Sequence, residues 1–324
     1  MRLSAALLRS LVLLSFSACG PHRSEEPAAE VEEPAAAPEA YSLDGKPLYP
    51  AELSPEDRVR LEANLAEAQA RFDENPDDPE NVIWLGRRLG YLGRYRDAIE
   101  VYSRGIEKHP DYYKLYRHRG HRYISVRKFD EAIADLEKAA SLIEGVPDEM
   151  EPDGAPNPAV IPRSTSHSNI WYHLGLAYYL KGDLDNAARA YEASMEFSRN
   201  NDDSSVASSD WLYMIYRRLG RNEDAAKVLE PIREEMDILE NGSYHRRLLM
   251  YKGLLAPEDL LGDGTSDGIE LATQGYGVGN WYFYNGEVAR AKDIFERVVA
   301  GSAWSAFGFI AAEADLKRMG EGSS

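Results

Sequence analysis

The sequence predicts an all-α solenoid of antiparallel helix pairs, and three observations support that fold class. Residues 79–112 read as one helix, a glycine turn at Gly93, a second helix and a stop at Pro110. Thirty-four residues further on, the same pattern recurs at Gly120, Tyr123, Ala132 and Leu136. A period of that length is typical of stacked-repeat proteins. Tyrosine also outnumbers phenylalanine, 20 to 8, which suits a large surface because a tyrosine ring packs while its hydroxyl stays hydrated.

The first eighteen residues read as an export signal. Arg2 and Arg9 provide the positive charge at its start, and residues 10–18 form a short apolar stretch. A membrane-spanning helix needs about 20 apolar residues, so this stretch predicts a cleaved signal peptide over residues 1–18.

Small residues precede Cys19, the single cysteine of the chain. This arrangement resembles the lipobox of bacterial lipoprotein signal peptides, although Phe16 stands where that family usually has leucine. The resemblance implies that Cys19 is lipidated and becomes the mature N-terminus. Because Gly20 follows it, the resemblance also implies sorting to the outer membrane in a cell with two membranes. The alternative is an ordinary secretory signal with a chance cysteine.

Residues 19–50 are predicted to form a lipidated N-terminus and a disordered tether. Residues 21–40 are rich in proline, alanine and glutamate and contain almost no large apolar side chain. Such a segment buries too little surface to offset the entropy of ordering. The predicted order is therefore an anchor, a tether and a folded body over residues 51–319, with a disordered tail at 320–324.

The body begins with a helix that Ser54 caps and Pro55 starts. Two repeats follow, at 79–112 and 113–143. Residues 144–167 contain five prolines and are predicted to be a loop inserted between repeats. Insertions of this kind often lie on the binding face of a solenoid.

The third repeat carries the pattern most completely, with Trp171, Leu174, Gly175, Tyr178, Gly182, Ala187 and Tyr191. This spacing resembles the tetratricopeptide repeat family. The resemblance implies a right-handed superhelical solenoid in which the first helix of each pair lines a concave groove. About six repeats are expected, the fifth of them degenerate with a short second helix near 257–261. A last helix containing Gly308 is expected to cover the exposed end of the stack.

On that geometry, the groove candidates are basic and aromatic residues of the first helices. They are Arg87, Tyr91, Arg117, His121, Tyr172, Tyr179, Arg217, Arg218, Tyr276, Phe283 and Tyr284. Arginine with tyrosine is the residue mix of interface hot spots, which favours a groove for an acidic or carboxylate-bearing peptide segment. The alternative is that these side chains are solvated helix faces and inter-helix packing.

The sequence contains few other features that indicate a catalytic, metal-binding or nucleic-acid-binding site. A net charge of -18 argues against nucleic acid or anionic lipid as partners of the bulk surface. His118 and His121 share a helix face but lack further ligands at zinc spacing, and 263–268 only partly matches a calcium loop. We therefore predict no enzyme activity, no cofactor and no metal. The expected function is a lipid-anchored, protein-binding scaffold of the bacterial cell envelope. A self-associating envelope protein and a subunit that delivers substrates to an envelope enzyme are the alternatives.

Overall fold

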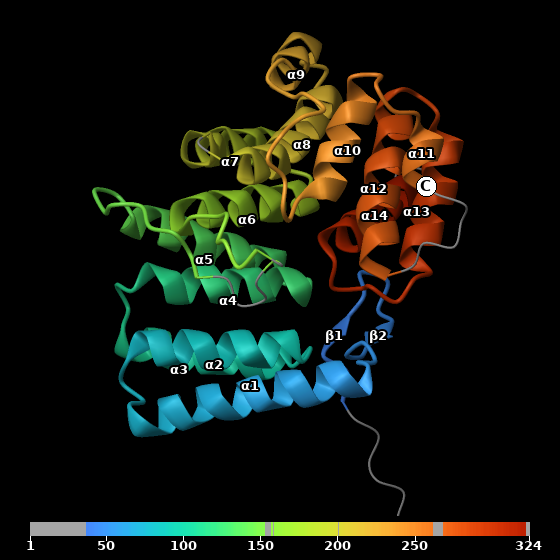
Figure 1. Ribbon diagram of the computed structural model, residues 1–324. Coiled ribbons are helices and arrows are strands. Elements are labelled where there is room, and N and C mark those ends of the chain that lie inside the picture. The colour runs from blue at the N-terminus through green and yellow to red at the C-terminus, as the bar shows by residue number, and fades with distance from the viewer. Residues whose placement is uncertain (1–36, 153–156, 158, 200, 262–267, 322–324) are drawn as a thin grey trace, which may run out of the picture. The chain divides into compact units, whose positions relative to one another are not determined.

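In this computed structural model, the described chain comprises residues 37–152, 157, 159–199, 201–261 and 268–321, which form fourteen helices and a two-stranded hairpin (Figure 1). The strands are β1 (Ala40–Tyr41) and β2 (Pro47–Leu48), paired antiparallel with Ala40 opposite Leu48. The helices are α1 (Pro55–Glu74), α2 (Pro79–Tyr91), α3 (Tyr95–Lys108), α4 (Tyr113–Ser125), α5 (Phe129–Leu142), α6 (Ser166–Lys181), α7 (Leu184–Ser198), α8 (Asp202–Arg218), α9 (Asn222–Leu229), α10 (Gly242–Tyr251), α11 (Pro257–Leu261), α12 (Gly268–Tyr284), α13 (Val288–Val299) and α14 (Phe307–Glu321).

The helices from α2 to α13 pack as consecutive pairs, and each pair lies against the next one. The fold class is therefore all-α, a superhelical solenoid of the tetratricopeptide type, as the sequence predicts. The pair α10 and α11 occupies the position of the degenerate repeat, and α11 has only five residues. Ser54 caps α1 by accepting a hydrogen bond from the Asp57 amide, and Pro55 is its first residue.

A left-handed residue makes the turn within each of these pairs. Glycine fills that position at Gly93, Gly182, Gly220, Gly253 and Gly286, with φ between 73° and 89°. In the second pair the position belongs to Arg127, with φ 64°. Left-handed backbone costs a residue with a Cβ atom about 1–2 kcal/mol, so Arg127 needs stabilising contacts at this turn. The Arg127 side chain pairs with Glu313 of α14 at 2.9 Å and donates to the Trp304 carbonyl at 2.8 Å.

Two other glycines explain why the paired helices cross closely. A Cβ added at Gly86 would lie 2.4 Å from the Tyr102 ring, and one at Gly175 would lie 2.6 Å from the Tyr191 ring. Both tyrosines are almost fully buried. The small residue of the first helix therefore makes room for the aromatic residue of the second, as the repeat pattern predicts.

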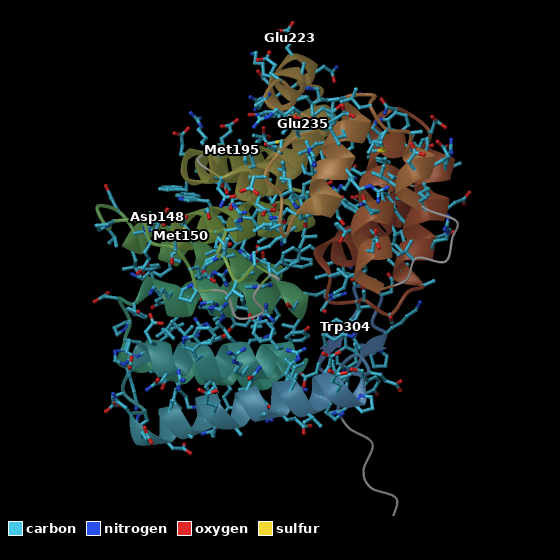
Figure 2. All side chains as sticks on the ribbon, viewed as in Figure 1. Asp148, Met150, Met195, Glu223, Glu235 and Trp304 are labelled. Atoms are coloured by element: carbon cyan, nitrogen blue, oxygen red, sulfur yellow. The ribbon has the colours of Figure 1, made fainter. Side chains whose placement is uncertain are left out.

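The disordered tether was predicted to continue to residue 50, but residues 37–50 are ordered in the structure. They form the β1–β2 hairpin, whose Leu43 amide donates to Glu313 of α14 at 2.7 Å. The Trp304 indole N–H donates to the Tyr49 carbonyl at 2.5 Å. In Figure 2 the labelled Trp304 lies beside this hairpin. These bonds to residues far along the chain hold the hairpin against α14 and the segment before it.

Helix α14 lies further inside the solenoid than the sequence predicts. It packs on α12 and α13 as a terminal helix should, but it also contacts α6. Arg218 of α8 donates to both carboxylate oxygens of its Asp315. The helix therefore covers the end of the stack and part of the concave side as well. It extends to Glu321, two residues beyond the predicted end of the body at 319.

The insertion between α5 and α6 folds back over α2 and α4. Met150 pairs with Thr165 in an isolated β-bridge, and the Glu151 amide donates to the Ser164 carbonyl at 3.0 Å. Asp148 and Met150 are labelled on this segment in Figure 2. Across the residues that the structure describes, no helix is both long and apolar enough to cross a membrane.

Candidate functional site

A cleft of about 540 Å³ opens between the ends of several helices. Tyr91 ends α2, and His121 lies in the last turns of α4. Tyr244 comes from the start of α10, Trp304 from the segment that precedes α14, and Phe307 is the first residue of α14. The cleft thus combines aromatic walls with the polar atoms of a histidine and tyrosines, a lining suited to a partly apolar ligand.

A smaller pocket of about 100 Å³ adjoins this cleft, and we call it the arginine pocket. Its lining residues are Arg87, Tyr91, Tyr102, Arg117, His118, His121, Arg122 and Glu151. Three of these, Tyr91, His121 and Arg122, also line the cleft. The two cavities therefore share a wall and form one candidate site.

Glu151 brings the only carboxylate among the residues lining the arginine pocket. Its Oε1 atom lies 2.9 Å from Arg117 Nη2 and 4.0 Å from Arg87 Nη1. Its Oε2 atom accepts a hydrogen bond from the Asn169 amide at 3.1 Å. Glu151 thus comes from the insertion, whereas the arginines come from α2 and α4.

Arg117 is the most buried of these cations, with 9% of its side chain exposed. Its Nη1 donates to His118 Nδ1 at 2.9 Å, but its buried Nε atom has no hydrogen-bond partner. Burial lowers the pKa of Arg117, and Glu151 offsets this only in part. Three arginines and one glutamate line the pocket, so it carries excess positive charge in a chain whose net charge is -18.

Three histidines lie beside these cations in a neutral form. Burial, reinforced by Arg117 and Arg122, holds the pKa values of His118, His121 and His173 well below the usual value. Arg87 also lowers the pKa of His118. The Tyr102 ring stacks on the His118 ring, with the two centroids 5.9 Å apart. The His121 and His173 rings lie 4.4 Å apart and Phe307 packs against both.

These histidines predict a loss of stability in mild acid. Because the folded pKa values lie below the unfolded value near 6.5, only the unfolded chain takes up protons as the pH falls, which favours unfolding. Each histidine contributes about 1.4 kcal/mol per pH unit below that value. Burial raises the pKa of Asp210 to about 7. The folded chain therefore takes up a proton at Asp210 as the pH falls, which offsets the destabilisation by one of the three histidines. Urea unfolding at about pH 6.5 and about pH 5.5 should show a net loss on the order of 2–3 kcal/mol. A His121→Asn, His173→Asn variant should show a smaller loss, and an equal loss in both proteins would contradict the assignment.

The structure divides the predicted groove residues into separate groups. Arg87, Tyr91, Arg117 and His121 meet at the arginine pocket. A second group is covered by α14, because Arg218 pairs with Asp315 and the Tyr276 hydroxyl donates to the same carboxylate at 3.0 Å. This group consists of Tyr179, Arg218, Tyr276 and Phe283.

The remaining candidates lie elsewhere. Arg217 stacks on the Tyr284 ring at 4.6 Å and donates to Asn285 at 2.9 Å. The Tyr172 hydroxyl accepts from the Trp211 indole at 2.8 Å and donates to the Tyr244 hydroxyl at 3.2 Å. Whether any of these residues binds a peptide stays a prediction.

Sequence reasoning missed Arg122, Glu151 and Phe307. Arg122 belongs to the basic run at 117–122, which is visible in the sequence. Only Arg117 and His121 of that run were predicted to line the groove. Glu151 and Phe307 had no such signal, because the fold-back of the insertion and the docking of α14 bring them to the site.

Among the described residues no group of three or more histidine, cysteine, aspartate or glutamate side chains is arranged to hold a metal ion. The calcium-like segment at 263–267 and the lipidation candidate Cys19 lie outside the described residues.

Comparison with known proteins identifies the repeats. Two tetratricopeptide repeat family models match the chain, one over residues 168–201 and the other over residues 85–147. The chain thus carries tetratricopeptide repeats, and proteins built from them are protein-interaction scaffolds.

Among curated proteins, BBSome complex member BBS4 of Bos taurus is 27% identical over 174 residues, which is 52% of this chain and 28% of that protein. The Mus musculus protein of the same name is 25% identical over 146 residues, 44% of this chain and 24% of that one. The chain therefore spans about a quarter of the length of these relatives.

Several solved structures are similar to this chain at low sequence identity. The MamA crystal structure has a TM-score of 0.41 and 16% identity, covering 63% of this chain and 100% of that one. YrrB, described as a tetratricopeptide repeat protein with an unusual peptide-binding site, has a TM-score of 0.41 and 14% identity, covering 76% and 97%. The Cut9–Hcn1 hetero-tetramer has a TM-score of 0.46 and 14% identity, covering 80% and 40%.

Proposed function

We propose that this protein is a non-catalytic scaffold that binds an extended, acidic segment of a partner protein on its concave side. The observation that carries the proposal is the excess of arginine over carboxylate in the arginine pocket, beside an open aromatic cleft. Such an excess attracts anionic partners, whereas the net charge of the whole chain repels them.

The cleft suits a peptide better than a small metabolite. It is open, and its walls come from the ends of several different helices. The Tyr91, His121 and Phe307 rings offer flat surfaces, and the tyrosine hydroxyl and the imidazole nitrogens add polar atoms, as peptide-binding sites commonly do. Tetratricopeptide repeats elsewhere in the chain then serve to hold these helix ends at fixed positions.

The proposed location is the bacterial cell envelope. Export by residues 1–18 and lipidation of Cys19 would hold the folded body at a membrane, on the outer membrane in a cell with two. Intact-mass measurement of protein extracted from membranes tests this. A Cys19→Ala variant that still partitions into membranes would contradict the lipid anchor.

Peptide binding can be measured with a fluorescein-labelled peptide of glutamate and phenylalanine and a counterpart with glutamine in place of glutamate. We expect the native protein to bind the acidic peptide more tightly. Arg117→Gln and Arg122→Gln should each weaken that binding about tenfold, equivalent to about 1.4 kcal/mol. Fluorescence anisotropy gives the dissociation constants.

The matched control is Arg104→Gln on the outer helix α3, where the arginine is 66% exposed and pairs with Glu100. It should leave the affinity unchanged. Arg122→Gln is the more informative variant, because it leaves the Arg117–Glu151 pair intact. Equal binding of the two peptides, or equal losses for Arg104→Gln and Arg122→Gln, would contradict the proposed site.

A further inference from the structure

We propose that the arginine pocket is a carboxylate-binding subsite and that Glu151 occupies the position of the partner's carboxylate while no partner is bound. This inference rests on the proposed function and names the part of the ligand that the pocket recognises. The ligand class is an aspartate or glutamate side chain of the bound segment. Glu151 then acts as a competitor built into the chain.

The first argument is the balance of charge. Arg87 and Arg117 have only 10% and 9% of their side chains exposed. Buried cations need an anionic partner, because desolvation disfavours a charge that is not compensated. With Arg122 on the same wall and Glu151 as the lining carboxylate, the pocket holds fewer anions than cations.

The second argument is the incomplete geometry of the Glu151 contact. A guanidinium can hold both oxygens of a carboxylate in parallel hydrogen bonds. Here a single oxygen, Oε1, faces both Arg117 and Arg87, and its distance to Arg87 is 4.0 Å. Arg87 Nη1 instead donates to the Pro152 carbonyl at 2.8 Å. The buried Arg117 Nε has no partner, so a donor remains for a second acceptor.

The third argument is access. Tyr91, His121 and Arg122 line both the arginine pocket and the cleft. A peptide lying in the cleft would therefore pass the mouth of the pocket, and an acidic side chain could reach the arginines from there. Glu151 approaches the same arginines from the insertion. Internal and external carboxylates thus compete for the same donors.

A second glutamate of the insertion provides a control. Glu149 pairs with Lys114 at 2.8 Å and accepts a hydrogen bond from the Tyr113 hydroxyl at 2.9 Å. It is half exposed and does not line the arginine pocket. A change at Glu149 alters the charge of the insertion by the same amount as a change at Glu151 but does not vacate the pocket.

The experiment compares Glu151→Gln, Glu149→Gln and the native protein, using the acidic peptide and its glutamine counterpart. Glu151→Gln should bind the acidic peptide about three- to tenfold more tightly than the native protein, because the internal carboxylate no longer competes. The glutamine peptide should be unaffected. Glu149→Gln should show native affinity for both peptides.

A second readout uses sodium sulfate as the probe, with sodium chloride at equal ionic strength. Sulfate should raise the thermal midpoint of Glu151→Gln above the chloride control, and raise it less in the native protein and in Glu149→Gln. A sulfate response confirms that the variant folds with an available anion site.

The outcomes separate the two proposals. If the native protein binds the acidic peptide but Glu151→Gln binds it no more tightly, Glu151 is not a competitor and the proposed function stands. If Glu149→Gln gains as much affinity as Glu151→Gln, the effect is general charge repulsion and the inference is wrong. If neither the native protein nor Glu151→Gln prefers the acidic peptide, the carboxylate subsite and the acidic-segment function are both overturned.

Discussion

Asp315→Asn should lower the free energy of unfolding by about 3–5 kcal/mol, because it leaves the Arg218 guanidinium buried without its carboxylate. Asp315 has 3% of its side chain exposed and Arg218 has 8%. Two hydrogen bonds, of 2.9 Å and 2.5 Å, join them. Burial works to raise the pKa of Asp315, but Arg218 and Arg318 outweigh it and hold that pKa below its usual value. The folded protein thus favours the charged carboxylate.

Urea unfolding followed by circular dichroism measures this loss. Glu296→Gln is the control, since Glu296 pairs with Lys292 at 3.8 Å and is 56% exposed. Exposed pairs contribute about 0–1 kcal/mol, so this variant should unfold almost as the native protein does. Hydrogen exchange should also quicken within 307–321 in Asp315→Asn, because α14 loses its tie to α8. Similar unfolding midpoints for Asp315→Asn and Glu296→Gln would contradict the prediction.

Trp211→Ala should destabilise the fold by a comparable amount, about 3–5 kcal/mol, because it empties the centre of the aromatic core. Trp211 is fully buried. Its ring stacks on Tyr191 of α7 and Tyr276 of α12, with centroids 6.3 Å and 5.8 Å away, and meets Tyr179 of α6 edge-on at 5.2 Å. One side chain on α8 therefore joins three helices from two other repeats.

The control for this prediction is Trp281→Ala on α12. Trp281 is half-buried and its ring meets Tyr282 at 4.9 Å. Less apolar surface is lost there, so we expect a smaller cost of about 1–2 kcal/mol. Thermal unfolding compares the two variants. A Trp211→Ala protein as stable as Trp281→Ala would show that the core tolerates loss of the central ring.

Peptide binding links Asp315 to the proposed function. The α14 residue Phe307 lines the cleft and contacts His121. If α14 loosens in Asp315→Asn, we expect the cleft to widen and peptide affinity to fall together with stability. Arg122→Gln should instead lower peptide affinity while its unfolding midpoint stays nearly unchanged. Measuring both quantities therefore distinguishes a site that loses its structure from one that loses a binding residue.

Local sequence was sufficient to place the helix pairs. The turn at Gly182 and the cap at Ser54 each depend on residues within a few positions of each other, and their physical causes are local as well. A positive φ favours glycine, and a serine hydroxyl satisfies a free amide at a helix start. The small residue at Gly175 and the aromatic residue at Tyr191 also recur at fixed spacing, because each repeat must fit the next.

The site was predicted only in part. Arg87, Tyr91, Arg117 and His121 were named and do meet at one pocket. Arg218 and Tyr276 were named for the same groove, but the structure places them against Asp315 of α14. A position on the first helix of a repeat indicates which side a residue faces. It does not indicate what another segment of the chain will place there.

By itself, then, the sequence determined an all-α solenoid, the order of its helix pairs and the basic and aromatic residues carried by their first helices. Only the tertiary structure decided which of those residues remain available. Leu43 and Glu313 are 270 positions apart, and Arg127 and Glu313 are 186 apart. Contacts at such separations leave no periodic pattern in the chain. They depend on the rotation that accumulates from repeat to repeat, which sets whether α14 lies near the α4–α5 turn.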